Sequence, residues 1–306
     1  MAYRSLCDLD DPGLRADLER IAALRLRQRR QALNWLLSGG AAALVSACGG
    51  GSDGTSSATA GSATSTTSTS TSTSTSTATT ATGGGTACVL NATETNGPYP
   101  ADGTNTLNGM AVNALTQSGI VRSDIRGSVG ISSNTAPGVP FVLTVNVVNA
   151  NNACAPLADY AVYVWHCDRA GNYSLYSSGV QGENWLRGVQ LTNPSGQASF
   201  TTIFPGCYSG RYPHIHFEVY SSLGMASIGS NARLISQLAL PRDACAAVYA
   251  SATGYAASAT ALNGVTLAGD NVFGDNSAAQ MAQMTAAVSG SVAAGYTGAI
   301  TIGVAA

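Results

Sequence analysis

The stretch GCYSGRYPHIHFEVY, residues 206–220, holds two of the chain's three histidines, one residue apart. Its second half is rich in β-branched and aromatic residues, which predicts a β-strand. Side chains alternate between the two faces of a strand, so His214 and His216 should share one face while Ile215 points to the other. This spacing offers two imidazoles to one metal ion, although an isolated pair of this kind can also be exposed or simply hydrogen-bonded.

Five further segments show the same strand signals, being short, β-branched or aromatic, and bounded by Gly, Pro, Asn or Asp. They are residues 139–150, 159–168, 196–204, 232–240 and 295–304. A helix is predicted to start near residues 241–250, and a turn or short helix near residue 277. Many short strands without regular βαβ alternation predict an all-β fold, an antiparallel β-sandwich or barrel with long loops and little helix.

The composition divides the chain of 306 residues into three parts. Residues 49–86 are almost wholly Gly, Ser, Thr and Ala, and so contain too little apolar surface to offset the entropy of ordering them. We predict a disordered linker there. Residues 87–306 are long enough for one catalytic or binding domain with a sizeable core, and residues 1–48 form a separate leader.

The leader has the features of a bacterial export signal. Arg25, Arg27, Arg29 and Arg30 precede the apolar stretch ALNWLLSGGAAALVSAC, residues 32–48, which is short for a permanent membrane span. Arg29 and Arg30 form a twin-arginine pair, used for exporting folded proteins, but the pair is also compatible with an ordinary positive region.

The end of the leader resembles the bacterial lipobox, because the small residues of VSA precede Cys48 and Gly49 follows it. The resemblance implies a lipidated Cys48, whose several acyl chains would give stable membrane anchoring. We therefore expect an exported, membrane-anchored lipoprotein of the bacterial envelope, on the periplasmic side or at the cell surface.

The charged residues argue against a nucleic-acid partner. All 14 basic residues are arginines, and seven of them lie within the first thirty positions. From residue 87 onward seven Arg face ten Asp plus Glu, so no basic surface is expected to hold a phosphate backbone.

Five cysteines follow the linker, and outside the cytoplasm they can pair. Their spacing does not select one pairing. We predict Cys88 with Cys154 and Cys207 with Cys245, which leaves Cys167 as a buried thiol.

Two tyrosines are expected near the histidine pair. Tyr208 follows a strand that ends at Pro205, and Tyr173 follows the turn after the strand at 159–168. Two ionised phenols and two imidazoles form a hard, anionic ligand set that suits Fe(III) better than Zn(II) or Cu(I). A trivalent ion would also lower the phenol pKa far below its usual value of about 10.

The segments VYVWHCDRAGNYS (162–174) and FTTIFPGCYSGRYPHIHFEVY (200–220) resemble the intradiol ring-cleavage dioxygenases, of the protocatechuate 3,4-dioxygenase and catechol 1,2-dioxygenase type. With the weaker ETNGPYP near the start, the resemblance spans about residues 94–302. It implies that a non-haem Fe(III) is bound by Tyr173, Tyr208, His214 and His216.

The resemblance also implies the reaction. A small aromatic diol and O2 would be the substrates, and cleavage between the two hydroxylated carbons would give a muconate-type dicarboxylate. Tyr208 would leave the metal and act as a base, while Arg211 and Gln237, in LISQLAL, would help to hold the diolate and polarise the oxygenated intermediate. No other cofactor is implied.

Some positions depart from the family pattern, and some candidate side chains can be purely structural. Only five residues separate Tyr208 from His214, and Tyr212 stands where the family commonly has Pro, so the substrate entrance should differ. His166 is expected to be structural, and either a core or a pocket role is open for Tyr99 and Trp185. The positions of Glu183, Asp168 and Asp270 in the chain do not have the spacing that would indicate a functional pair of carboxylates. The alternative function is a tethered, non-catalytic β-sandwich that binds a carbohydrate, a surface partner or iron.

Overall fold

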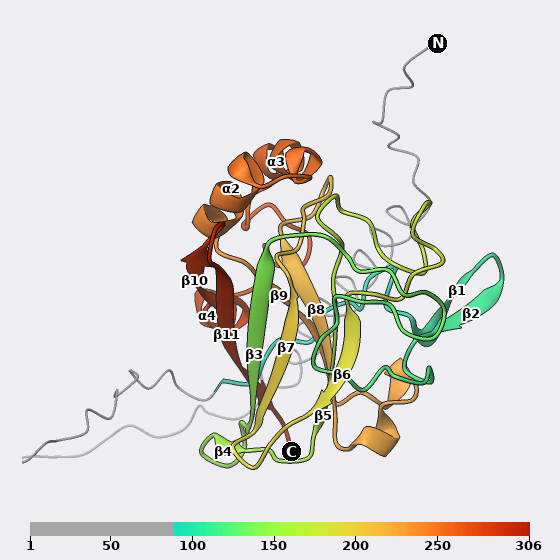
Figure 1. The fold of residues 1–306 in the computed structure, drawn as a ribbon. Helices are drawn as coiled ribbons and strands as arrows, with labels where there is room; N and C mark the ends of the chain where they lie inside the picture. Colours follow the sequence, from blue (N-terminus) through green and yellow to red (C-terminus); the bar gives the residue numbers. More distant parts are fainter. Residues whose placement is uncertain (1–88) are drawn as a thin grey trace, which may run out of the picture. The chain divides into compact units, whose positions relative to one another are not determined.

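The computed structural model describes residues 89–306, and its strands form two main sheets that lie against each other (Figure 1). The five-stranded sheet contains β3 (Pro140–Asn149), β4 (Ala155–Pro156), β7 (Gln197–Ile203), β10 (Ala287–Ser291) and β11 (Gly295–Val304). The four-stranded sheet has the order β6 (Arg187–Leu191), β5 (Ala161–Trp165), β8 (His214–Tyr220) and β9 (Leu234–Ala239). The predicted all-β sandwich is confirmed.

The remaining elements lie around the sheets. A hairpin of β1 (Asp102–Leu107) and β2 (Met110–Asn113) projects at the side, and helices α2 (Arg242–Ser251) and α3 (Ala256–Asn263) lie beyond one end of the strands (Figure 1). Helix α4 (Ala278–Met284) begins with a capping box between Ser277 and Gln280. Two 3-10 turns, η1 (Leu223–Met225) and η2 (Gly229–Asn231), interrupt the connection from β8 to β9.

The core between the sheets explains the alternation in β8. Ile215, Phe217 and Val219 are fully buried and belong to the same cluster as Phe141 and Leu143 of β3. The intervening residues of β8 therefore point to the other face of the four-stranded sheet. That face carries His214 and His216, as the sequence predicted.

The six predicted strands correspond to β3, β5, β7, β8, β9 and β11, and the two predicted helical regions to α2 and α4. One pairing differs from a purely antiparallel sandwich. β11 runs parallel to β3, from Tyr296 opposite Phe141 to Val304 opposite Asn149. A parallel pair is possible because a long connection separates the two strands in the chain.

The predicted Cys207–Cys245 disulfide is wrong, because both cysteines are free and buried. The Cys207 thiol donates to the Arg211 carbonyl at 3.5 Å, and the Cys245 thiol hydrogen-bonds with Tyr249, so each is satisfied without a bridge. Cys167 is a free buried thiol, as predicted. Cys154 is disulfide-bonded, but its predicted partner Cys88 lies outside the described residues.

The leader, Cys48 and the linker also lie outside the described residues, so the export signal, the lipid anchor and the disordered tether remain predictions. Within residues 89–306, no helix has the length and apolar character needed to span a membrane.

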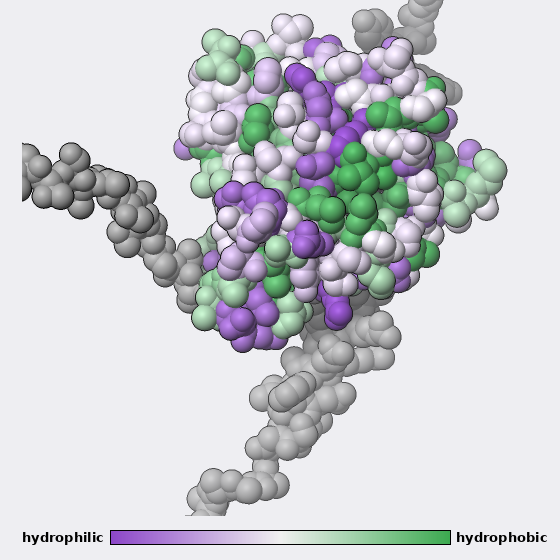
Figure 2. All heavy atoms as spheres, turned by 60° about the horizontal axis from the view of Figure 1, so that its bottom comes forward, coloured by the Kyte–Doolittle hydropathy of each residue, from purple (hydrophilic) through white to green (hydrophobic). Residues whose placement is uncertain are grey.

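Apolar side chains reach the surface of the described domain in places, and Figure 2 shows a group of them on one face. The exposed large hydrophobic residues are Leu90, Met110, Val121, Ile131, Val142, Leu191, Leu223, Met225 and Ile228. None of the predicted site residues is among them.

Candidate metal centre

The four predicted metal ligands converge on one point. The Nε2 atom of His214 lies 3.1 Å from Nε2 of His216 and 3.3 Å from the phenol oxygen of Tyr173. It also lies 3.3 Å from the phenol oxygen of Tyr208. The four donor atoms thus come together although Tyr173 and His214 are 41 positions apart in the chain.

Strands β5 and β8 fix the two imidazoles. The His216 ring stacks on Trp165, its partner in the β5–β8 pairing, with centroids 4.8 Å apart and planes only 8° from parallel. Nδ1 of His214 hydrogen-bonds with the carbonyl of Tyr212. When that nitrogen carries the proton, Nε2 presents its lone pair to the centre, as a metal ligand must.

The loop between β5 and β6 positions Tyr173. Its backbone N–H donates to the Ser177 hydroxyl at 2.9 Å, and the ring is buried. Gly171, with φ of +92°, lies so close that a Cβ there would meet the Tyr208 Cβ at 3.0 Å. Glycine at this position lets the two tyrosine segments approach each other.

Arg187, buried at the start of β6, holds this loop against the segment at residues 94–100, which we call the strap. The guanidinium donates to the hydroxyl and carbonyl of Ser174 at 3.0 Å each. It also donates to the Pro100 carbonyl at 3.1 Å and to the Tyr163 hydroxyl at 3.3 Å. The Arg187 side chain therefore connects Ser174, the neighbour of Tyr173, to the strap.

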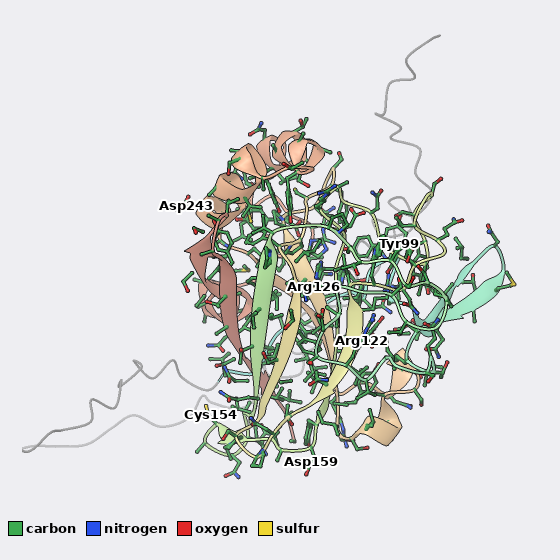
Figure 3. The ribbon with its side chains drawn as sticks, in the orientation of Figure 1. Tyr99, Arg122, Arg126, Cys154, Asp159 and Asp243 are labelled. Atoms are coloured by element: carbon green, nitrogen blue, oxygen red, sulfur yellow. The ribbon has the colours of Figure 1, made fainter. Side chains whose placement is uncertain are left out.

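The strap passes directly over the centre. A Cβ on Gly97 would meet Cε1 of His216 at 3.0 Å, and the carbonyl of Thr95 accepts from Nε2 of Gln237 at 2.9 Å. Tyr99, labelled in Figure 3, packs its ring 5.0 Å from that of Tyr173. The sequence left both a core role and a pocket role open for Tyr99, and the structure places its ring beside the site.

Arg211 and Gln237 lie next to each other and next to the ligands. Nη2 of Arg211 donates to Oε1 of Gln237 at 2.6 Å, and Gln237 stands opposite His216 in the β8–β9 pairing. The Arg211 guanidinium also forms a buried salt bridge with Asp270 at 3.1 Å. Asp270 further accepts the backbone N–H of Tyr212 at 2.7 Å, so it fixes the segment leading into β8.

Burial and charge set the protonation of these groups. Burial and the nearby Arg211 lower the pKa of His214 to about 3, and burial and His214 lower that of His216, so both imidazoles are neutral at physiological pH. Burial raises the pKa of Asp270, but Arg211 and the Tyr212 N–H outweigh it and hold this pKa below its usual value. Burial also raises the pKa of Tyr173 above the ordinary phenol value.

The donor set fits a hard, highly charged cation only when the phenols take part. Among the described residues, no group of three or more His, Cys, Asp or Glu side chains could hold a metal ion. The two neutral imidazoles supply no charge, whereas two tyrosinates supply two negative charges. This combination matches Fe(III), the ion expected from the sequence.

Other candidates from the sequence have structural roles. Both ring nitrogens of His166 are hydrogen-bonded, to the Thr202 hydroxyl at 2.7 Å and to the Cys167 carbonyl at 2.8 Å. Trp185 packs in a small core cluster with Leu186 and Ile203. Glu183 accepts from Ser128 and Asn134 and so fixes a surface loop.

The sequence did not predict the salt bridge of Asp270 with Arg211, or that Glu94 accepts from the Asn276 side chain at 2.9 Å. Asp270 lies in LAGDNVF, 59 residues after Arg211, where no motif marks it. Glu94 stands at the start of the ETNGPYP motif, which carries only a weak part of the resemblance.

Residues 122–252 match a family model described as dioxygenase. The solved intradiol ring-cleavage dioxygenase from Tetranychus urticae is similar with a TM-score of 0.51 and 21% identity, over 71% of this chain and 95% of that one. A second dioxygenase crystal structure gives a TM-score of 0.52 and 21% identity, over 71% and 94%. No match was found among the curated proteins.

Proposed function

We propose that this chain, which belongs to the family of intradiol ring-cleavage dioxygenases, uses a non-haem Fe(III) to cleave a catechol-type aromatic with O2 into a muconate-type dicarboxylate. The observation that carries the proposal is the convergence of two phenol oxygens and the Nε2 atom of His216 within 3.3 Å of His214 Nε2. The ordered spacing of these residues in the chain supports it independently.

Tyr173, Tyr208, His214 and His216 would hold the iron. When bound, Fe(III) supplies a Lewis acid that binds the diol as its dianion and withdraws electron density from the ring. The protein contributes neutral imidazoles, which need no deprotonation before binding. It also contributes a buried Tyr173, which remains in place while substrate enters.

Tyr208 differs from the other three ligands because it is half-buried rather than buried. It is therefore the ligand that an entering diol reaches first, and its phenolate oxygen takes one of the two protons that the diol gives up. Arg211 and Gln237 orient the bound ring through a hydrogen-bonded pair that Asp270 and Thr95 hold rigid. The strap and Trp165 limit access of water to the His216 side.

The test is the visible spectrum of the purified chain with metal analysis, followed by addition of a catechol without oxygen and then of O2. We expect a tyrosinate-to-Fe(III) band that shifts on catechol binding, and ring cleavage with oxygen uptake. Tyr208→Phe should alter the band and slow cleavage by orders of magnitude, and His216→Ala should abolish iron retention.

Tyr296→Phe is the matched control, because Tyr296 belongs to the core between the sheets on β11. It should leave iron content, band and cleavage unchanged. Unaltered iron content and cleavage in Tyr208→Phe and His216→Ala would refute the assignment. Iron retention without oxygen uptake on any of catechol, protocatechuate and hydroxyquinol would favour the binding module instead.

A further inference from the structure

Glu94, at the start of the strap, lies beside the residues that would orient the substrate. Its backbone N–H donates to the Ile235 carbonyl at 2.8 Å, two residues before Gln237. Its carboxylate accepts from the Asn276 side chain at 2.9 Å. The next residue, Thr95, accepts the hydrogen bond from Gln237. Glu94 is thus held between β9 and the segment that follows Asp270.

The charges around Glu94 add up to an acidic environment. The groups that act on it are Asp275, Arg211 and Asp270. Arg211 is the one cation among them, and its guanidinium is already neutralised by the buried salt bridge to Asp270. Among the charged groups that act on Glu94, the carboxylates therefore outnumber the single cation, and that cation is already paired.

The charge of Glu94 changes near neutral pH. Burial raises its pKa to about 7, against the lowering effects of Asn276 and Arg211, while Asp275 and Asp270 raise it further. The carboxyl is therefore mainly neutral below pH 7 and mainly ionised above it.

We propose that Glu94 is a specificity-determining residue that makes the site discriminate against catechols with an anionic ring substituent and favour those with neutral substituents. This inference rests on the proposed function and narrows its substrate class. A carboxylate on the ring beside Glu94 would lose hydration on entry, meet like charge, and find the nearby Arg211 already paired with Asp270. A neutral substituent of similar size avoids that cost.

The test uses a matched pair of substrates, 3,4-dihydroxybenzoate and its methyl ester, with the iron-loaded full chain. The ratio of kcat/KM for ester over acid is measured at pH 6 and pH 8. Affinity for each compound is measured without oxygen, from the shift of the visible band. Asp159→Asn is the control variant, because it also removes one negative charge, in an exposed turn well away from Tyr99 (Figure 3). The positive φ of Asp159, 60°, is one that Asn tolerates.

We expect the wild type to prefer the ester by about tenfold at pH 8, the effect of one like charge at close range in a partly screened site. The preference of the wild type for the ester should be smaller at pH 6. Glu94→Gln should lose most of it at pH 8 and become insensitive to pH, while Asp159→Asn behaves as wild type. Asp275→Asn, at an exposed position, should give a smaller change in the same direction.

Equal use of acid and ester by the wild type at both pH values would overturn the inference without any variant. A wild-type preference that Glu94→Gln leaves intact would overturn the role of Glu94. Failure to cleave either compound, or catechol itself, would instead count against the proposed function, so the two failures are distinguishable.

Discussion

Gly97 shows how a residue without a side chain decides the geometry of the centre. Its φ of +72° disfavours other residues, and an added Cβ would press on the His216 ring at 3.0 Å. We expect Gly97→Ala to displace His216 and lower iron affinity at least tenfold, in addition to a backbone cost of about 1–2 kcal/mol. A chelator titration followed by the visible band, with thermal unfolding, measures both effects.

Gly109→Ala provides the control for Gly97→Ala. Its φ is +80°, yet nothing lies within 4 Å of the added Cβ. The two variants should lose similar stability, and Gly109→Ala should keep wild-type iron affinity. Equal iron affinity in both would show that the strap does not set the position of His216.

The phenols make metal binding depend on pH. Without metal, burial raises the pKa of Tyr173, whereas a bound cation reverses that shift, so binding releases the phenol proton. The imidazoles are already neutral and release none above about pH 5, since the pKa of His214 is about 3. Ferric affinity should therefore rise with pH, by up to about tenfold per unit for each phenol proton released.

Competition with a chelator of known pH dependence, between pH 5.5 and 7.5, measures this slope. Tyr173→Phe should reduce it by one proton. A slope that does not change in that variant would mean that Tyr173 binds without ionising or does not bind.

At the scale of the element, β8 combines an apolar face toward the core with a polar face that extends past the histidines. Glu218 and Tyr220 continue this polar face, and both are fully buried. The Tyr220 hydroxyl donates to Glu218, and the carboxyl of Asp102 in β1 is also hydrogen-bonded to it. Burial next to a second carboxyl favours the neutral, protonated form of Glu218.

This arrangement makes stability depend on pH. Burial first, and then Asp102, raise the pKa of Glu218 above its unfolded value. A raised folded-state pKa gives stability that is present below the unfolded value of about 4.3 and is lost as the pH rises toward the folded-state pKa. In Glu218→Gln the side-chain amide can still donate a hydrogen bond to Asp102, but the group at position 218 no longer titrates. We expect it to gain stability relative to wild type as the pH increases from 5 to 8, in denaturant unfolding.

The effect of Asp124→Asn on stability should have the opposite pH dependence. Arg126 lowers the pKa of Asp124, so its contribution is present at neutral pH and disappears as the pH falls. The exposed pair should contribute little at any pH. A constant stability difference between Glu218→Gln and wild type across the pH range would contradict a raised pKa of Glu218.

The elements differ in how far the sequence predicts them. Period-two alternation and β-branched residues located β3, β7 and β8, and alternation also placed both histidines on one face. The β1–β2 hairpin was missed although Asn108 and Gly109, with φ of 53° and 80°, form a typical hairpin turn. The parallel pairing of β11 with β3 has no local signal, because register between distant strands is decided by tertiary packing.

Within the site, too, some residues could be predicted from the sequence and others could not. The four candidate ligands could be selected from the sequence because they stand in two compact, ordered motifs. Asp270 and Glu94 were not, because their roles arise from contacts between segments distant in the chain and neither contact has a spacing that a sequence reveals. The Cys207–Cys245 disulfide was wrongly predicted for a similar reason, since cysteine count gives no geometry.

At the scale of the whole molecule, the lipid anchor stays a prediction based on Cys48 and the residues before it. Cys48→Ser in the full chain should move the protein from the membrane or detergent phase to the aqueous phase, because acylation supplies the anchor. Fractionation of a bacterial host expressing both forms measures this. Equal partition of the two forms into the membrane would refute lipidation at Cys48.

The pairing of β11 with β3 also determines when this domain can fold. β11 follows β3 only after a long stretch of chain, and Ile300 pairs with Val145 of the first long strand. Such a high contact order delays folding, and the five-stranded sheet can be completed only after β11 has been synthesised and has left the ribosome. Until then β3 has an unpaired side that is prone to aggregation, so a nascent chain would depend on chaperones for longer than a protein built from local hairpins.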